Sequence, residues 1–245
     1  MIPELTRNDL RFVVQRLPRD IRDLLSEHHG KLILGGGFIR AVIAGETPSD
    51  IDLFAHDADF LDSVAKILAD RRTGKGDRVK THKSKNAITV LTADRLPIQF
   101  ITRWTFTRPA ELVKSFDFTV CQAAVWRSGN QSNDPWMSEV GENFYVDLAG
   151  RRLVYTAPAR IEEAGGSLLR VIKYVKRGYS IQVSSLGAVV ARLASAVHPD
   201  RMGEWNEQEI ALIFGGLLRE VDPLLVVDGL DVVDDHEPAE EGDVA

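Results

Sequence analysis

Two aspartates separated by one residue are the side chains of this sequence whose types and spacing best suit chemistry. Asp50 and Asp52 lie in a segment that alternates polar and apolar residues, so on a strand both carboxylates project from one face. Neighbouring carboxylates repel each other unless a cation lies between them. Mg²⁺ prefers oxygen ligands and is often held by one or two carboxylates together with substrate phosphates. The spacing therefore predicts a site at which Asp50 and Asp52 bind Mg²⁺ or Mn²⁺ and act in catalysis.

The segment before these aspartates suits the binding of a triphosphate. Residues 31–34 form a short apolar strand that stops at three glycines, where the backbone can turn tightly or approach a ligand closely. An apolar helix over residues 38–44 follows, and its N-terminal N–H groups and positive dipole end favour a phosphate. An NTP is therefore the expected substrate. The residues expected to contact it here are Gly36, Gly37, Arg40 and Ser49.

Each of these signals is weak when taken alone. An Asp-x-Asp is common on solvated strand edges, and a Gly-Gly is usually a turn. The ordered combination of strand, glycine pair, short helix, turn and Asp-x-Asp strand is much rarer. It favours a nucleotidyltransferase-type site, in which two metal ions about 3.5–4 Å apart activate an acceptor hydroxyl and stabilise the departing pyrophosphate.

The same residues resemble the first motif of the DNA polymerase beta superfamily. Their spacing is most similar to the class II branch, which contains the tRNA CCA-adding enzymes and bacterial poly(A) polymerases. Asp117-Phe118-Thr119 resembles the second motif, which contacts the ribose of the incoming nucleotide. Asp147-Leu148 and residues 151–154 resemble the strand and loop that end the catalytic head, and residues 163–181 resemble the first neck helix. The resemblance covers about residues 31–182.

This resemblance implies an α/β fold, with a nucleotidyltransferase-type mixed-sheet head followed by an α-helical neck. It also implies transfer of a nucleoside monophosphate from an NTP such as ATP to an acceptor hydroxyl, with release of pyrophosphate. The expected acceptor is an RNA 3′ end such as that of tRNA, and a protein side chain or a small molecule is the alternative. Arg170 and Lys173 lie on a helix that borders the nucleotide in the family, and are expected phosphate contacts.

Several family residues are replaced in this chain. In the second motif, the two arginines are Ser115 and Phe116, and the asparagine is Cys121. In the neck helix, the family's base-reading Asp and Arg fall at Ala164 and Ser167. The protein template that chooses C and A is therefore missing, which argues against CCA addition. Any choice of base must come from other residues.

The third carboxylate of the expected site is also missing. The strand at residues 98–101 offers Gln99 where many polymerase beta relatives have an acid. Asp117 either compensates as a third catalytic carboxylate or holds a loop through hydrogen bonds. These replacements leave a second functional class open, a catalytically weak or inactive nucleotidyltransferase-like protein that works in binding or assembly. A third hypothesis is that the protein binds a nucleotide for regulation, without transfer.

Basic residues between positions 71 and 85 also have two interpretations. Lys83 and Lys85 either belong to a solvated loop or contact the triphosphate or an acceptor strand. The basic stripe of residues 170–177 recurs at helical spacing opposite apolar positions, and is either a solvated face or a phosphate-binding surface.

The composition is compatible with an intracellular enzyme. The chain has 245 residues, is 44% hydrophobic and 27% charged, and carries a net charge of −6. Its one cysteine, Cys121, excludes an internal disulfide and a cysteine-rich zinc site. It has neither a leader-like N-terminus nor an apolar run near the roughly 20 residues of a membrane span. We expect a soluble, cytoplasmic protein that does not bind membranes.

Periodicity and composition divide the chain into four parts. We expect an N-terminal helical segment (1–30, interrupted at Pro18), the head (31–155), a helical neck (156–230) and an acidic tail (231–245) that is solvated or binds a protein partner. The expected helices after the first segment cover residues 38–44, 60–71, 168–176, 186–196 and 207–218, with a short apolar end at 224–227. The expected strands cover residues 31–34, 50–54, 87–91 and 98–101, with an element at 117–125 and a polar loop at 128–143.

Overall fold

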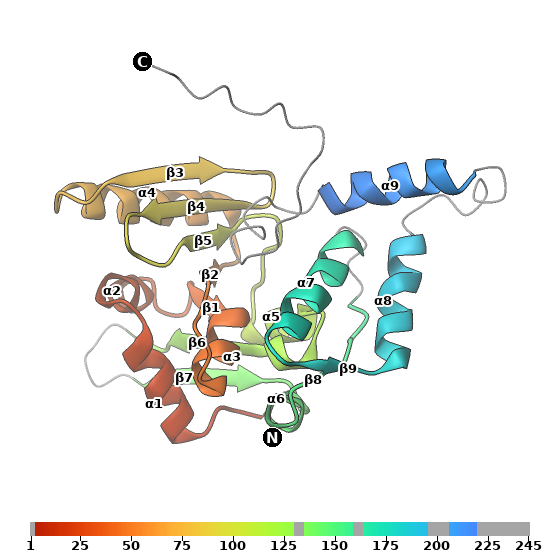
Figure 1. Cartoon of the computed structure of the whole chain (residues 1–245). Helices are drawn as coiled ribbons and strands as arrows, with labels where there is room; N and C mark the ends of the chain where they lie inside the picture. Colours follow the sequence, from red (N-terminus) through yellow and green to blue (C-terminus); the bar gives the residue numbers. More distant parts are fainter. Residues whose placement is uncertain (1–2, 130–134, 159–163, 196–205, 220–245) are drawn as a thin grey trace, which may run out of the picture.

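The computed structural model describes residues 3–129, 135–158, 164–195 and 206–219. These residues form a head built on a mixed β-sheet, with a group of neck helices beside it (Figure 1). The fold class predicted from the sequence is thus confirmed. Within these ranges, none of the helices has the length and apolarity needed to cross a membrane.

The sheet of the head has seven strands in the order β3-β4-β5-β2-β1-β6-β7. β2 and β5 are parallel, and all other neighbours are antiparallel. The central position of β2 brings Asp52 opposite Gly35 on one side and Gln99 on the other. The strands are β1 (Ile33–Gly35), β2 (Ile51–Phe54), β3 (Val79–Lys83), β4 (Ala87–Thr92), β5 (Ile98–Ile101), β6 (Ala123–Arg127) and β7 (Trp136–Val140).

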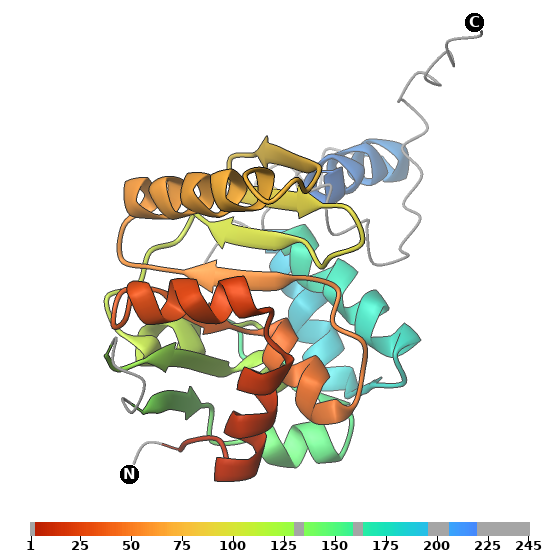
Figure 2. The ribbon, with the colours of Figure 1, turned by 90° about the vertical axis from the view of Figure 1, so that its left-hand side faces the viewer.

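The two faces of the sheet are covered differently. The larger core packs beneath the first four helices, and Figure 2 shows α1, α2 and α4 in front of the sheet. α5 covers the opposite face, where Ile33 and Phe54 pack on Leu112 and Val113. Leu34 belongs to the larger core, so alternate residues of β1 serve opposite faces. The head helices are α1 (Arg7–Arg16), α2 (Arg19–Glu27), α3 (Gly37–Ala44), α4 (Ala58–Thr73), α5 (Pro109–Ser115), the 3₁₀ helix η1 (Thr119–Cys121) and α6 (Phe144–Ala149).

The neck packs directly on the head. Val171, Tyr174 and Val189 belong to the same buried cluster as the core of the head. A two-stranded sheet adds a second connection, because β8 (Arg152–Leu153) pairs in parallel with β9 (Ser180–Ile181). Head and neck therefore share one hydrophobic core. The neck helices are α7 (Ala164–Lys176), α8 (Val183–Ser195) and α9 (Glu207–Arg219).

Most predicted elements are confirmed, and three predictions are wrong. β3 forms within the polar stretch before β4, β7 forms within the predicted loop 128–143, and Asp147 lies on α6 instead of on a strand. β3 and β7 are the two edges of the sheet, and four of the five residues of β3 are exposed. An edge strand can be polar on both faces, so it carries little of the alternation that reveals a half-buried strand. The expected apolar end at 224–227 lies outside the described residues.

Gly36 occupies a backbone conformation that requires glycine. It precedes α3 with φ +73° and ψ −129°, and a Cβ there would lie 2.9 Å from Cε1 of Phe116. We expect Gly36→Ala to lower the free energy of unfolding by about 1–3 kcal/mol, measured by urea denaturation. Gly37→Ala is the matched control, since nothing lies within 4 Å of its added Cβ. Equal stability of the two variants would contradict the prediction.

Candidate active site

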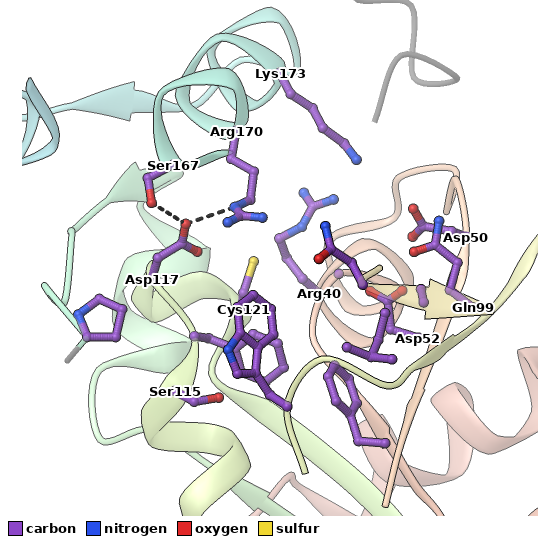
Figure 3. Close-up of a pocket in the computed structure, with 18 of the residues that line it drawn as sticks. Arg40, Asp50, Asp52, Gln99, Ser115, Asp117, Cys121, Ser167, Arg170 and Lys173 are labelled. Carbon is purple, nitrogen blue, oxygen red and sulfur yellow. Dashed lines mark hydrogen bonds and ion pairs between the residues drawn. The ribbon is translucent and has the colours of Figure 1, made fainter. Parts of the chain in front are cut away.

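A cavity of about 180 Å³ lies where the head meets α7 (Figure 3). It brings together most of the site residues predicted from the sequence. The head contributes Gly37, Arg40, Ser49, Asp50, Asp52 and Asp117 to its wall. α7 contributes Arg170 and Lys173. The cavity therefore combines the Asp-x-Asp pair with basic side chains of the neck.

The Asp-x-Asp pair sits at the centre of the sheet. Asp52 is on β2, Asp50 directly precedes that strand, and both side chains are half-buried. Gln99 of β5 is in register with Asp52 and lines the same cavity. Over the described ranges, no group of three or more His, Cys, Asp or Glu side chains is placed to hold a metal ion. The local donor set is thus two carboxylates and one amide.

Lys173 brings a positive charge to this pair from the neck. Lys173 is buried, and its Nζ donates a hydrogen bond to Oγ of Ser49 at 3.5 Å. Burial lowers the pKa of Lys173, although the charges of Asp50 and Asp52 act to raise it. Figure 3 shows its side chain extending from α7 toward Asp50. The fold therefore places an ammonium group near both carboxylates.

Arg40 is a buried link between head and neck. Its Nη1 donates hydrogen bonds to Oε2 of Glu46 and, at 3.2 Å, to the hydroxyl of Tyr179. Its guanidinium carbon lies 4.7 Å from the ring centroid of Tyr174 and 5.5 Å from that of Tyr179. Arg40 also lines the cavity, but its observed partners are an acid and two neck tyrosines. The arrangement gives the arginine of the first motif a structural role.

Asp117 is bound by two side chains of α7. Its Oδ2 accepts hydrogen bonds from Oγ of Ser167 at 2.9 Å and from Nε of Arg170 at 2.8 Å. In Figure 3 this group lies across the cavity from Asp50. The observed contacts of Asp117 therefore fasten the segment before η1 to the neck helix.

Three predicted contact residues do not line the cavity. Gly36 packs against the ring of Phe116. Lys83 on the edge strand β3 donates from Nζ to Oδ1 of Asp62 at 2.8 Å, and Lys85 is exposed just after that strand. Lys83 and Lys85 are thus outside the cavity wall to which Asp50 and Asp52 contribute.

The structure adds cavity residues that no sequence motif indicated. Trp104, Asn86 and Arg192 line the wall. Nη1 of Arg103 donates to Oδ1 of Asn86 at 2.7 Å, and its guanidinium carbon lies 5.1 Å from the ring centroid of Trp104. These residues come from connections and from α8, so spacing along the chain gives no sign that they meet.

Most of the head also matches the model of a known protein family. The model described as "Gabija anti-defense 2 family protein" matches residues 4–151, which is more than half of the chain. The chain belongs to the Gabija anti-defense 2 family. None of the curated proteins with which this family member was compared matches it.

Solved structures similar to this Gabija anti-defense 2 family member include CCA-adding enzymes. The Thermotoga maritima CCA-adding enzyme complexed with tRNA_CCA is 16% identical with a TM-score of 0.54, covering 80% of this chain and 47% of its own. A CCA-adding enzyme with CTP is 16% identical with a TM-score of 0.53, and the match covers 86% of this chain and 49% of that enzyme. A CCA-adding enzyme with ATP is also 16% identical with a TM-score of 0.54, and the match covers 86% of this chain and 48% of that enzyme. This likeness confirms a nucleotidyltransferase fold. The chain spans about half the length of these enzymes.

Removing the buried charge of Lys173 is expected to stabilise the fold. Because burial lowers the pKa of Lys173, the unfolded chain binds this proton more tightly than the folded chain. We expect Lys173→Met to raise the free energy of unfolding at neutral pH in EDTA. The gain should shrink as pH rises toward the ordinary lysine pKa of 10.5, since wild type then loses the same charge. Urea denaturation at several pH values measures this, and a destabilised variant at pH 7 would contradict it.

Proposed function

We propose that this chain is a metal-dependent nucleotidyltransferase whose activity counteracts the Gabija defense named by its family. The reaction moves a nucleoside monophosphate from an NTP to an acceptor hydroxyl and releases pyrophosphate. The observation that carries the proposal is the cavity in which Asp50, Asp52 and Lys173 converge on a nucleotidyltransferase fold. An Asp-x-Asp on a solvated strand edge would not be expected to line a cavity together with a buried lysine from another part of the chain.

The side chains present fit one Mg²⁺ ion completed by substrate phosphates. Asp50 and Asp52 would hold it, with the amide oxygen of Gln99 beside Asp52. When bound, such an ion supplies Lewis-acid stabilisation of the charge that develops on the transferring phosphoryl group. Gln99 adds no negative charge, so the donor set favours one tightly held ion over two.

The chain's own groups would then position the triphosphate. Lys173 supplies an ammonium that can bind phosphate oxygens, and Ser49 orients it. Gly37 lines the cavity at the N-terminus of α3, where backbone N–H groups and the helix dipole favour an anion. With this geometry, the attacking hydroxyl would approach the phosphoryl group beside the Asp-x-Asp pair.

Two acceptors fit the comparisons. An RNA 3′ end is the first, because one similar structure is a CCA-adding enzyme complexed with tRNA. A hydroxyl on a component of the Gabija defense is the second, because of the family to which the chain belongs.

A second candidate function is nucleotide binding or assembly without catalysis. Lys173 favours it, because an ammonium near Asp50 and Asp52 relieves their repulsion without a metal ion. The presence of both Asp50 and Asp52 therefore does not by itself require a catalytic metal ion. Gln99 in place of a third carboxylate points the same way.

The experiment that separates these functions uses labelled nucleotides. Each α-labelled NTP is incubated with the protein, Mg²⁺ or Mn²⁺, and either total RNA or extract from cells with and without the Gabija defense. Nuclease or protease sensitivity of the labelled product identifies the acceptor. Transfer that requires Asp50 and Asp52 supports the proposal. NTP binding without transfer to any acceptor supports the second candidate instead.

A further inference from the structure

We infer that the outer edge of β3 is an interaction surface for an extended acidic segment of another protein. Such a segment would lie along β3 as an additional strand, the mode of recognition called strand addition. Its backbone would pair with the outward backbone groups of β3, and its carboxylates would lie beside the lysines of that strand. The inference is independent of the proposed function, because β3 contributes no residue to the cavity wall.

The two edges of the seven-stranded sheet differ in what lies beside them. At the β7 edge, the backbone N–H of Val140 donates to the carbonyl of Pro3 at 2.9 Å, and the N–H of Leu5 donates to Oγ of Ser138 at 3.1 Å. At the other edge, β3 pairs only with β4 in the part of the chain that the structure describes. Figure 1 shows β3 as the outermost strand on its side of the sheet. The N-terminal segment therefore covers one edge, and the described residues leave the other open.

The hydrogen bonds at the two ends of the β3–β4 ladder indicate which backbone groups of β3 point outward. The N–H of Ser84 donates to the carbonyl of Ala87 at 2.9 Å, and the N–H of Ala93 donates to the carbonyl of Arg78 at 3.5 Å. Alternate residues of an antiparallel strand direct their N–H and C=O groups toward the same neighbour. The even-numbered residues of this stretch thus face β4. The residues whose backbone groups face outward are Val79, Thr81 and Lys83.

Cations surround this open edge, although the net charge of the chain is −6. Residues 75–85 contain one acid, Asp77, which pairs with Arg95 at 2.9 Å. Lys83 shares Asp62 of α4 with Lys66, so these three side chains together keep one positive charge. The cations of the stretch are all exposed, and they are Lys75, Arg78, Lys80, Lys83 and Lys85. Their positive potential attracts a segment that carries carboxylates.

The same cations disfavour the other molecules that an open edge could accept. Lysine on an edge strand deters pairing with neutral or basic strands. A second copy of β3 would bring its own cations opposite these, and like charges that face each other across two strands are unfavourable. An acidic strand turns each such pair into an attraction. A nucleic acid would gain from the charge, but it cannot use the alternating donors and acceptors of the β3 backbone.

Fluorescence anisotropy with labelled ten-residue peptides tests the inference on the full chain. The first peptide alternates glutamate with threonine. The second has proline in place of each threonine, so it keeps the charge but lacks every second backbone donor. Wild type should bind the first peptide at least about fivefold more tightly than the second, because strand pairing adds hydrogen bonds to the attraction between charges.

Thr81→Pro separates backbone pairing from charge. The N–H of Thr81 points outward, so proline removes a donor of the open edge but leaves the β4 ladder and every charge in place. We expect this variant to bind the glutamate–threonine peptide at least about fivefold more weakly than wild type. Lys80→Glu, which reverses one charge of the edge, should weaken binding by a similar factor. Urea denaturation checks that both variants keep the fold.

Lys114→Glu is the matched control for the change of charge. Lys114 is an exposed cation on α5, outside the basic stretch at β3. This variant should bind the glutamate–threonine peptide with the wild-type affinity. An equal loss of binding in Lys80→Glu and Lys114→Glu would mean that the peptide responds only to the overall charge of the protein, and would overturn the inference.

Hydrogen exchange provides an independent test of the proposed pairing. The backbone amides of Thr81 and Lys83 should exchange quickly in the protein alone and more slowly when the first peptide is bound. Slow exchange without the peptide would mean that the edge is already occupied, and would overturn the inference.

The peptide measurements have two further outcomes that would overturn it. Equal binding of both peptides, or unchanged binding by Thr81→Pro, would make the surface a contact for charge alone. A single-stranded RNA that binds at β3 when neither peptide does would identify a nucleic-acid surface instead. The proposed function stands or falls separately, on label transfer that requires Asp50 and Asp52.

Discussion

Asp52→Asn is expected to lower the rate of nucleotide transfer by about 100- to 1,000-fold. Asp52 lies on the central strand beside Gln99, and its carboxylate faces the cavity that would take the triphosphate. An amide has nearly the same shape but carries no negative charge, so it is a weak ligand for Mg²⁺. Asp50→Asn should have an effect of the same order, because the two carboxylates would share the ion. Label transfer under saturating NTP measures both rates.

Asp59→Asn is the matched control for these variants. Asp59 is an exposed aspartate in the first turn of α4 and does not line the cavity. It should transfer label at the wild-type rate. The same variants should be compared in cells that carry the Gabija defense. If the proposed counteraction of the defense persists in Asp52→Asn, transfer is not its means.

Arg40→Met is expected to lower the free energy of unfolding by about 3 kcal/mol. This variant keeps an aliphatic side chain but removes the charge that lies between Glu46 and the rings of Tyr174 and Tyr179. Breaking a buried ion pair typically costs 3–5 kcal/mol, because the remaining charge loses its partner. We expect the lower end of this range, because Glu46 would keep two other cationic partners. Nη1 of Arg151 lies 3.4 Å from its Oε1, and Nη1 of Arg177 lies 3.8 Å from its Oε2. Urea denaturation measures the change.

Arg16→Met tests whether this effect depends on burial. Arg16 is an exposed arginine that also lies over an aromatic ring, 5.2 Å from the centroid of Phe12. Loss of that surface contact should change stability by no more than about 0.5 kcal/mol. Similar losses for Arg16→Met and Arg40→Met would mean that the buried pair does not hold the neck to the head.

Arg40 shows how tertiary contacts can give a motif residue a role that its motif does not indicate. Its place after the glycines predicted a contact with the triphosphate. In the fold, Tyr174 and Tyr179 enclose its guanidinium from the neck, far along the chain from α3. No pattern around Arg40 itself indicates these partners. Its main observed role is to join the two parts of the molecule between which the cavity forms.

The sequence by itself determined the features that depend on neighbours along the chain. The glycine run ends β1, the apolar stretch after it forms α3, and the two-residue period of β2 puts Asp50 and Asp52 on one face. Helical spacing likewise placed Arg170 and Lys173 on one neck helix. These predictions succeeded because strand and helix periods are local properties of the backbone.

Only the tertiary structure decided which of these side chains meet. Sheet order put Gln99 beside Asp52, and docking of the neck brought Lys173 to Ser49 from 124 residues away. The same docking turned Asp117 toward Arg170. Such contacts depend on how elements with similar apolar faces pack against one another, and local periodicity does not specify that choice. One short segment therefore predicted a reaction class, whereas the pairing of Asp117 with Arg170 appeared only in the folded chain.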